Sequence, residues 1–312
     1  MLQSFYGKGA GVIKKRITKL SHLYEVAASR DKTAVSVACA GDLHVLEAAK
    51  EAAGQDIADF IFVGDEQKIR SIANDLEFDV SGAQIVNELD PEIACKKAVS
   101  FVNTGEASAL MKGLVDTSVI MKATLNKEEG MRAGKKLSHL AVFECVSFHK
   151  LLFVTDAAIN IAPALEEKIE IIENAVMAVV NLGIGKPKVA LLAAKEKADP
   201  KMPVTLEITE IVQKHKSGVF QNAVVDGPFA LDNAVSEESA RIKGISSPVA
   251  GDADILVAPN IESANILYKS LAFLGGAKNG GVVIGAKRPV ILTSRADSSE
   301  SKLISIALGV LF

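Results

Sequence analysis

Residues 288–312 read RPVILTSRADSSESKLISIALGVLF, and this stretch contains a strand, a polar turn and a helix in direct succession. The apolar run 289–292 predicts the strand, and the strongly apolar segment 298–311 predicts a buried helix. Asp297 and Glu300 have the D-x-x-E spacing of a capping box, which places the helix start at Ser298. The polar residues between the two elements are Thr293, Ser294, Arg295, Asp297 and Ser298.

The polar turn after this strand has the composition of an anion site. Ligands of open α/β sheets bind beyond the carboxyl ends of strands, and the free N–H groups at a helix start attract anions. Arg295 adds a fixed positive charge with paired donors. Taken singly, Asp297 is explained as a helix cap, Ser294 as a turn residue and Arg295 as a surface ion pair. Together they predict chemistry on an anionic small molecule.

Strand and helix patterns alternate along the rest of the chain, which predicts an α/β protein with a parallel sheet covered on both faces. The expected strands before the last one are 33–39, 58–63, 84–87, 109–111, 139–147, 150–155, 188–193, 219–225, 254–258 and 282–285. The expected helices before the last one are 42–54, 66–76, 91–103, 115–125, 163–182, 204–216, 236–242 and 261–273.

Two segments interrupt this alternation. The charged stretch 126–136, NKEEGMRAGKK, predicts a hinge between domains. The strands 139–147 and 150–155 follow it, and the short turn between them predicts a hairpin in a mixed second sheet. Residues 226–251 form a long polar connection, of a kind that often has a function.

Composition bounds the class of protein. The chain has 312 residues, of which 49% are hydrophobic, enough for two domain cores. The formal net charge of −3, the absence of a basic tract and the absence of Trp argue against a nucleic-acid partner. The apolar runs are short and broken by charges, and the first residues lack a secretory pattern, so we expect neither a membrane span nor a signal peptide.

Cysteine and histidine positions argue against a disulfide framework and against a metal site. Cys39, Cys95 and Cys145 are scattered and odd in number, which fits a reduced cytoplasmic protein. Neither they nor the five histidines have metal-ligand spacing. The sequence also lacks HExxH, GxxxxGK[ST] and GxGxxG motifs, so zinc-protease, P-loop and dinucleotide sites are unsupported.

Other polar residues are candidates for the same site. Lys112 and Gly113 follow an expected strand, and Thr117 and Lys122 lie in the helix after it; a solvated lysine and a helix cap are the simpler explanation. Asn265 and Lys269 are spaced i, i+4 on another helix, where they line a cleft or face water.

Several segments together resemble the phosphate acetyl/butyryltransferase family, and most closely its butyryl branch. They are LMKGLVDTSVIMKATL, VTDAAINIAPALEEKIEIIENAV, DGPFALDNAVSEESARIKGISSPVAGDADILVAPNIESANILYKSLAF and RPVILTSRADSSESKLISIAL. The resemblance covers most of the chain from about Val35 onward. It implies two α/β domains around a cleft, in the isocitrate and isopropylmalate dehydrogenase architecture, with residues 1–134 plus 293–312 in the first domain and 135–292 in the second. It also implies a homodimer or a larger homo-oligomer.

The resemblance further implies the reaction and its partners: acyl-CoA and phosphate react reversibly to acyl phosphate and coenzyme A, without a metal and without a permanently bound cofactor. Ser294 and Arg295 match the Ser-Arg pair of the family motif, with Arg295 gripping phosphate and Ser294 bonding the sulfur or the developing oxyanion. The expected substrate-binding residues are Lys112, Gly113, Thr117, Lys122, Thr293, Asn265 and Lys269.

Two positions depart from the acetyl branch of the family. Lys122 stands where that branch has an arginine, and lysine is a point charge rather than a bidentate donor. Ser301 stands where that branch has an aspartate proposed as a base, so that role is not transferred. Asp297 is the nearest substitute, and direct attack without a protein base is the alternative.

Three other interpretations of the sequence remain. The acyl chain is butyryl, branched or acetyl, since one methylene contributes only about 1–3 kcal/mol of discrimination. A metal- and nicotinamide-dependent oxidative decarboxylase on the same fold needs an aspartate cluster, which the sequence does not show. A binding module that senses coenzyme A without turnover would not need the Ser294–Arg295 pair.

Overall fold

The structure is a computed structural model that describes residues 17–294 and 296–312. Contacts between Cα atoms divide the described chain into two compact units. Unit 1 contains Leu20–Lys135 and Gly280–Phe312, and unit 2 contains Lys136–Asn279. Each unit combines a sheet with surrounding helices, so the expected mixed α/β class is confirmed.

The strands of unit 1 follow the order β3-β2-β1-β4-β11-β10. Their bounds are β1 Ala34–Ala38, β2 Asp59–Gly64, β3 Gln84–Asn87, β4 Ala109–Lys112, β10 Lys278–Ile284 and β11 Val290–Ile291. The pairs from β3 to β11 are parallel, whereas β10 and β11 are antiparallel. The predicted parallel sheet is therefore confirmed for this unit except at β10, which forms a short hairpin with β11.

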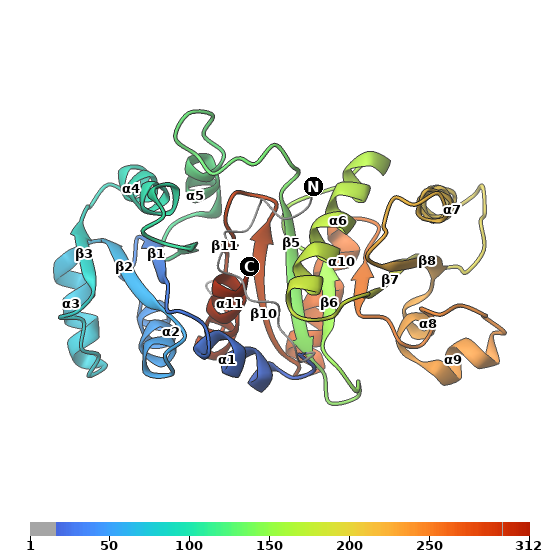
Figure 1. The fold of residues 1–312 in the computed structure, drawn as a ribbon, viewed down its shortest axis with the longest axis horizontal. Coiled ribbons are helices and arrows are strands. Elements are labelled where there is room, and N and C mark those ends of the chain that lie inside the picture. Colours follow the sequence, from blue (N-terminus) through green and yellow to red (C-terminus); the bar gives the residue numbers. More distant parts are fainter. Residues whose placement is uncertain (1–16, 295) are drawn as a thin grey trace. The chain divides into compact units, whose positions relative to one another are not determined.

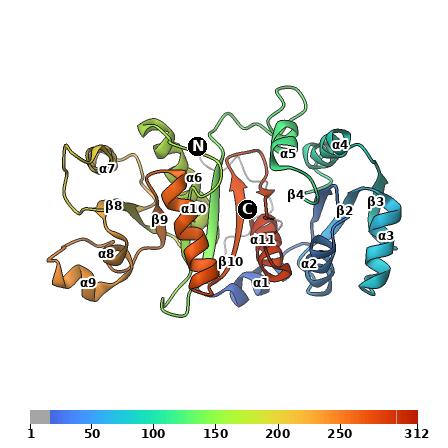
Figure 2. The ribbon, with the colours of Figure 1, turned by 180° about the vertical axis from the view of Figure 1, so that it is seen from behind.

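The helices of unit 1 begin within two residues of the predicted positions, except α1, which the sequence analysis did not predict. Their bounds are α1 Leu20–Ala28, α2 Leu43–Gly54, α3 Glu66–Asp75, α4 Pro91–Thr104, α5 Thr117–Thr124 and α11 Ser299–Leu311. Asp42, Asp65 and Asp90 cap α2, α3 and α4 through their side chains, which satisfies N–H groups that have no partner within the helix. Figures 1 and 2 show α4 on one side of β1 and β2 and α2 on the other.

The last helix, α11, is buried as its sequence predicts. Ile304, Ile306 and Leu308 are at most 1% exposed. The helix packs against α1 and α2, and both ribbon views show α1 and α11 side by side although they lie at opposite ends of the chain (Figures 1 and 2). Arg30 after α1 donates to the carbonyl of Leu311 at 3.1 Å, which fixes the end of α11.

Residues 280–292 belong to unit 1, whereas the sequence analysis assigned them to the second domain. Strand pairing explains this difference, because Val290 and Ile291 lie in parallel register with Leu110 and Met111 of β4. Non-local pairing of this kind leaves no local signal in the sequence, and the hairpin between β10 and β11 extends the unit further toward the N-terminus.

Unit 2 contains a mixed sheet with the order β5-β6-β9-β7-β8. The bounds are β5 Ser138–Glu144, β6 Leu152–Thr155, β7 Lys188–Leu192, β8 Val224–Phe229 and β9 Ile255–Val257. The pair β5–β6 is antiparallel, which confirms the predicted hairpin, and the pairs β6–β9, β9–β7 and β7–β8 are parallel.

One predicted strand of unit 2 was wrong in extent, and one helix was not predicted. The strand expected at 219–225 is β8, which runs from Val224 through Gly227-Pro228, and a register shift between Ala190 and Leu192 accommodates these residues. The polar connection also contains an unpredicted short helix, α8. The helices are α6 Leu165–Asn181, α7 Pro203–Lys216, α8 Leu231–Val235, α9 Glu237–Ile242 and α10 Ile261–Lys269, which continues into a π-helical turn, η1 Ser270–Leu274.

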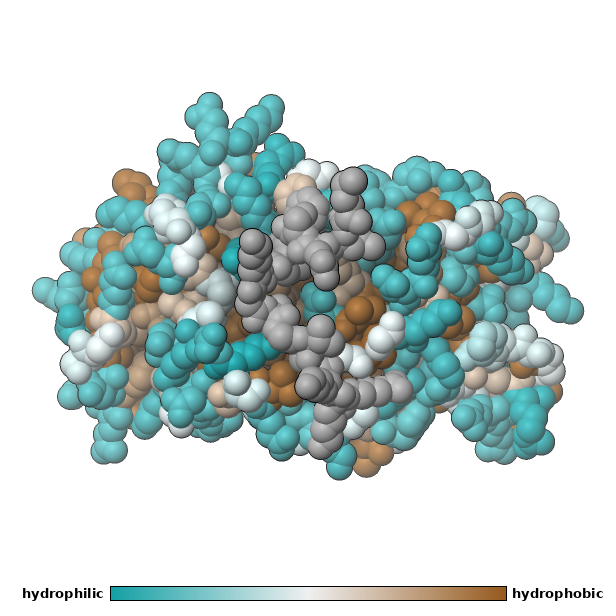
Figure 3. Space-filling model, in the orientation of Figure 1, coloured by the Kyte–Doolittle hydropathy of each residue, from teal (hydrophilic) through white to brown (hydrophobic). Residues whose placement is uncertain are grey.

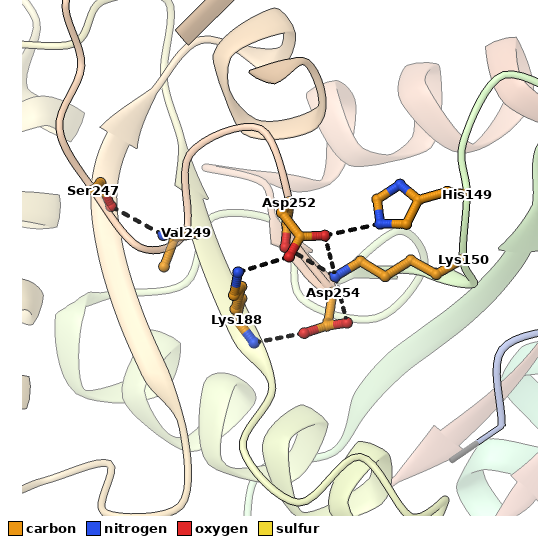
Figure 4. Close-up of polar contacts among 7 residues, drawn as sticks. All are labelled: His149, Lys150, Lys188, Ser247, Val249, Asp252 and Asp254. Atoms are coloured by element: carbon orange, nitrogen blue, oxygen red, sulfur yellow. Dashed lines mark hydrogen bonds and ion pairs between the residues drawn. The ribbon is translucent and has the colours of Figure 1, made fainter. Parts of the chain in front are cut away.

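A charged network closes the amino-terminal side of the unit 2 sheet (Figure 4). The Lys150 ammonium is 2.8 Å from carboxylate oxygens of both Asp252 and Asp254, and its side chain is 6% exposed. Asp252 also accepts from Lys188 at 2.6 Å and contacts His149 at 3.0 Å. Burial raises the pKa of Asp252, but hydrogen bonds and charges of Lys150 and Lys188 outweigh it and lower the value to about 2.

Outside the residues drawn in grey, the face drawn in Figure 3 shows apolar side chains in separate patches among hydrophilic ones. Within residues 17–294 and 296–312, no helix has the length and apolar character needed to cross a membrane.

Candidate active site at the carboxyl ends of β4 and β11

Parallel pairing brings two of the predicted site segments together. Ile291 of β11 lies opposite Met111 of β4, and Lys112 lies opposite Ala38 of β1. The turns after β4 and β11 therefore leave the sheet at the same edge, next to each other. The first turn begins with Gly113 and the second contains Thr293, which is buried, and Ser294, which is exposed. Arg295 lies outside the described residues.

Gly113 is required by the packing of this edge. A Cβ atom added to it would lie 2.2 Å from the carbonyl oxygen of Cys39 and 2.7 Å from that of Ala38, far inside van der Waals contact. The Gly113 N–H donates to Ala38 O, and the Leu114 N–H donates to Cys39 O, both at 2.8 Å. The close backbone approach predicted for Gly113 is thus a contact with the backbone of Ala38 and Cys39. A contact of Gly113 with substrate stays a prediction.

Lys112 is buried, with 6% of its surface exposed. Its ammonium donates to the carbonyls of Gly113 at 3.2 Å and Val115 at 3.1 Å. Lysine is rarely buried unless its charge is satisfied, and here it braces the turn that leads into α5. The side chain places positive charge under this turn, as an anion site requires.

Thr117 and Lys122 lie on α5, the helix that follows this turn. Thr117 is its first residue and is exposed, so it lies among the free N–H groups of the helix start. Lys122 is one turn further along, with its side chain 72% exposed, and its ammonium is 3.2 Å from a Glu92 carboxylate oxygen. Glu92 therefore offsets the charge that the sequence assigned to phosphate binding.

The predicted cap of α11 was wrong. Ser298 is the N-cap, and its hydroxyl accepts from the Ser301 N–H at 3.1 Å. Asp297 instead accepts from the Ser294 N–H through Oδ2 at 2.7 Å. Ser and Asp are comparable N-cap residues, so two neighbouring candidates cannot be separated by spacing alone. Asp297 is consequently bound to the motif turn rather than to the helix.

Lys302, which the sequence did not indicate as a site residue, donates hydrogen bonds to the turn that contains Ser294 and Asp297. It is 3% exposed, and its ammonium donates to the carbonyls of Asp297 at 2.6 Å and Ser294 at 3.3 Å. Burial lowers the pKa of this lysine, and the charges of Asp297, Asp42 and Glu47 oppose the effect. A lysine in the first turn of an apolar helix is unfavourable for the helix dipole, and that was the available signal.

Asn265 and Lys269 lie on α10, which belongs to unit 2, whereas the other candidate residues belong to unit 1. The Asn265 amide donates to the Ala157 carbonyl at 3.1 Å, and the Lys269 ammonium lies 5.9 Å from the centre of the Phe273 ring. Both side chains thus have contacts within unit 2 that account for their positions, and their predicted substrate contacts stay untested.

Comparison with known proteins identifies the family. A family model described as phosphate acetyl/butaryl transferase matches residues 19–94 and 92–310. The chain belongs to this family. The resemblance inferred from the sequence segments is therefore confirmed.

Both phosphate butyryltransferases and phosphate acetyltransferases are among the proteins similar to the chain. It is 48% identical to the phosphate butyryltransferase of Clostridium acetobutylicum, over 91% of this chain and 94% of that protein. It is 43% identical to the phosphate acetyltransferase of Thermotoga maritima, over 94% of this chain and 99% of that protein. A solved branched-chain phosphotransacylase from Enterococcus faecalis V583 superposes with a TM-score of 0.80 at 38% identity, covering 89% of this chain and 98% of that one.

One groove of the described residues lies away from this edge. A groove of about 750 Å³ in unit 1 is lined by residues of α4, of the loop 128–129 and of the turn 287–288, and it includes none of the predicted site residues. In the part of the chain that the structure describes, no three His, Cys, Asp or Glu side chains are grouped as metal ligands.

Proposed function

We propose that this family member transfers a short acyl group, butyryl or branched-chain, reversibly between coenzyme A and inorganic phosphate. The observation that carries the proposal is the 48% identity with a phosphate butyryltransferase over nine-tenths of both chains. The likeness to a branched-chain phosphotransacylase structure supports the same chemistry. The joined turns after β4 and β11 supply a polar edge at which that chemistry can take place.

The reaction has a simple balance of bonds. A phosphate oxygen attacks the thioester carbonyl, the C–S bond of the tetrahedral intermediate breaks, and coenzyme A leaves as a thiolate that takes up a proton. In reverse, the thiolate attacks the acyl phosphate and inorganic phosphate leaves. Both reactants are anions, so the protein must offset their repulsion and align them.

The residues of the motif turn divide this work. The exposed hydroxyl of Ser294 is proposed to donate to the leaving sulfur or to the oxyanion, and Arg295 to bind phosphate bidentately. Lys122 adds a second charge for phosphate when it separates from Glu92. Lys112, Gly113, Thr117 and Thr293 are proposed to form the rest of the binding edge, and Asn265 and Lys269 to contact substrate from unit 2.

Asp297 is proposed as the residue that takes up or supplies the proton. Support comes from the cap of α11, because Ser298 fills that position and leaves Asp297 to the motif turn. Its Oδ2 accepts from the Ser294 N–H, so the carboxylate stands next to the residue whose hydroxyl is proposed to act. Direct attack by the coenzyme A thiolate remains the alternative, since a thiol ionises with little assistance.

Lys302 is proposed as a positioning residue for Ser294. It lies beneath the turn and donates to the carbonyls on both sides of the Arg295 position. These bonds fix the backbone carbonyls of Ser294 and Asp297. Precise placement of such groups contributes strongly to rate, because misplacement by about 1 Å can cost about 10²-fold.

The remaining features implied by the family are also proposals. An isocitrate and isopropylmalate dehydrogenase-like architecture is supported by the fold of 4-hydroxythreonine-4-phosphate dehydrogenase from Klebsiella pneumoniae, with a TM-score of 0.56 at 14% identity. A homo-oligomer is supported by exposed apolar side chains of Ile266, Phe273 and Leu274 on α10 and η1. A cytoplasmic location is supported by cysteines that are all unpaired.

Acetyl transfer is the second candidate, because the acetyltransferase of Thermotoga maritima is nearly as similar as the butyryl enzymes. The reverse reaction separates the two. Butyryl, isobutyryl and acetyl phosphate are each incubated with coenzyme A, and thioester formation is compared with phosphate release. We expect equal amounts of both products and the highest kcat/KM with a four-carbon chain. A preference for acetyl phosphate would replace the butyryl proposal with acetyl transfer.

A further inference from the structure

Two of the three cysteines meet beside the candidate site. Cys39 directly follows β1 at a left-handed backbone position (φ 54°) and is half-buried, whereas Cys95 is fully buried in α4. Helix α4 packs on β1. The Cys39 thiol points to the first turn of this helix, with its sulfur 4.0 Å from the Pro91 carbonyl. Pro91 and Cys95 are four residues apart and share one face of the helix.

The two neighbouring thiols shift each other's pKa in opposite directions. The interaction with Cys95 lowers the pKa of Cys39, burial opposes this, and the charge of Lys112 lowers it further. The interaction with Cys39 and burial both raise the pKa of Cys95. Cys39 is therefore the more exposed and more acidic thiol of the pair, and Cys95 is the buried and less acidic one, an asymmetry typical of reactive cysteines with a resolving partner.

Cys39 is also tied to the turn that carries Lys112 and Gly113. Its carbonyl accepts from the Leu114 N–H at 2.8 Å, and no side chain fits between its backbone and that of Gly113. Any movement of Cys39 is therefore transmitted to the turn. Cys145 has neither feature: it follows β5 in unit 2, and burial raises its pKa.

We propose that Cys39 and Cys95 form a peroxide-sensitive thiol pair, in which Cys39 is oxidised first and Cys95 closes a reversible disulfide at the edge of the candidate site. The Cys39 thiolate attacks one oxygen of hydrogen peroxide, the O–O bond breaks, and Cys39 sulfenic acid and hydroxide form; the hydroxide takes up a proton and becomes water. The Cys95 thiol then attacks the sulfenic sulfur, water leaves, and the S–S bond forms. The peroxide is the oxidant and is reduced by two electrons.

The effect on activity rests on the proposed transacylase function. A bond between Cys39 and Cys95 draws the Cys39 backbone toward α4 and displaces the turn that Leu114 and Gly113 share with it. We expect oxidation to reduce phosphate-dependent turnover by about 10-fold or more, as expected for a displaced site. Dithiothreitol is expected to restore it.

The test uses the whole protein and reads mass rather than activity. After hydrogen peroxide treatment and alkylation of remaining thiols, we expect loss of two hydrogen atoms and a cross-linked peptide pair containing Cys39 and Cys95. Cys145→Ser, the matched control, is expected to behave like the wild type. Cys95→Ala is expected to stop at a Cys39 sulfenic acid that dimedone labels. Cys39→Ser is expected to give neither product.

Two outcomes would overturn the thiol pair: no cross-link in the folded wild type, or dimedone labelling of Cys145 as fast as that of Cys39. If Cys95→Ala does not fold, the rate of iodoacetamide labelling in the wild type decides, with Cys39 expected to react first. A cross-link without loss of turnover would overturn the coupling to the site. A wild type that forms the cross-link and lacks turnover even when reduced would overturn the transacylase proposal and leave the thiol pair standing.

Discussion

Substitution of Lys302 by methionine tests whether this buried lysine positions the motif turn. Methionine preserves the apolar stem and most of the volume, so α11 retains its packing. The change removes the donors to the carbonyls of Asp297 and Ser294. We expect a fall in kcat with a smaller change in the free energy of unfolding.

The magnitude follows from the two hydrogen bonds and the burial of the charge. Hydrogen bonds to a charged group contribute about 1.5–3 kcal/mol each, so two contribute about 3–6 kcal/mol. The lowered pKa of Lys302 shows that the cost of burying the charge offsets part of this stabilisation. A net loss of about 1–3 kcal/mol in positioning corresponds to about a 5- to 150-fold decrease in kcat.

The assay compares kcat and the KM for phosphate in three proteins, together with their thermal unfolding. Lys302→Arg retains the charge and is expected to recover part of the rate. Lys168→Met removes another buried lysine, one that pairs with Glu207 at 2.6 Å in unit 2, and serves as the control for loss of stability without loss of kcat. A Lys302→Met protein with kcat within about twofold of wild type would refute the positioning role.

Two further predictions concern other charged contacts. Asp252 has a pKa of about 2, below its ordinary value of 3.8, so its contribution to stability is present above pH ~4 and is lost as the pH falls toward 2. Asp252→Asn is expected to lower the free energy of unfolding of unit 2 by about 1–2 kcal/mol at pH 7, measured by urea unfolding and after allowance for solvent screening. The loss is expected to be much smaller at pH 2. Equal losses at both pH values would contradict pairing with Lys150 and Lys188 as the cause of the lowered pKa. Glu92→Gln removes the ion-pair partner of Lys122 and is expected to lower the KM for phosphate a fewfold at low salt. Glu88→Gln, which removes the ion-pair partner of Lys97, is the control. An unchanged KM in Glu92→Gln would exclude Lys122 from the phosphate site.

Local signals in the sequence were sufficient for most elements of the fold. The start of α4 at Asp90–Pro91 was predicted from a capping aspartate before a proline, and both act locally. The prediction of the α11 N-cap was wrong because Asp297 and Ser298 are adjacent residues with similar preference for that position. β8 was misplaced because Gly227-Pro228 indicates a turn, whereas in the structure a register shift in the pairing of β7 with β8 accommodates both residues within β8.

The candidate site was predicted in its parts but not in its assembly. The Ser294 turn and the Lys112–Gly113 turn were each visible as polar residues after an apolar strand. Their adjacency depends on the parallel pairing of β4 with β11, in which Val290 lies opposite Leu110, 180 positions earlier in the chain, and no local pattern specifies such a pairing. Lys302 was overlooked for the same reason, since its side chain becomes buried only when α11 packs against β4, β11 and the neighbouring helices.

The most direct test of the account is the dependence of coenzyme A release on phosphate. Acetyl-, butyryl- and isobutyryl-CoA are each incubated with the protein, and the freed thiol is followed with a thiol reagent, with and without inorganic phosphate. The account predicts release that requires phosphate and is fastest with a four-carbon acyl chain. Release at the same rate without phosphate, or no release with any of the three substrates, would contradict it.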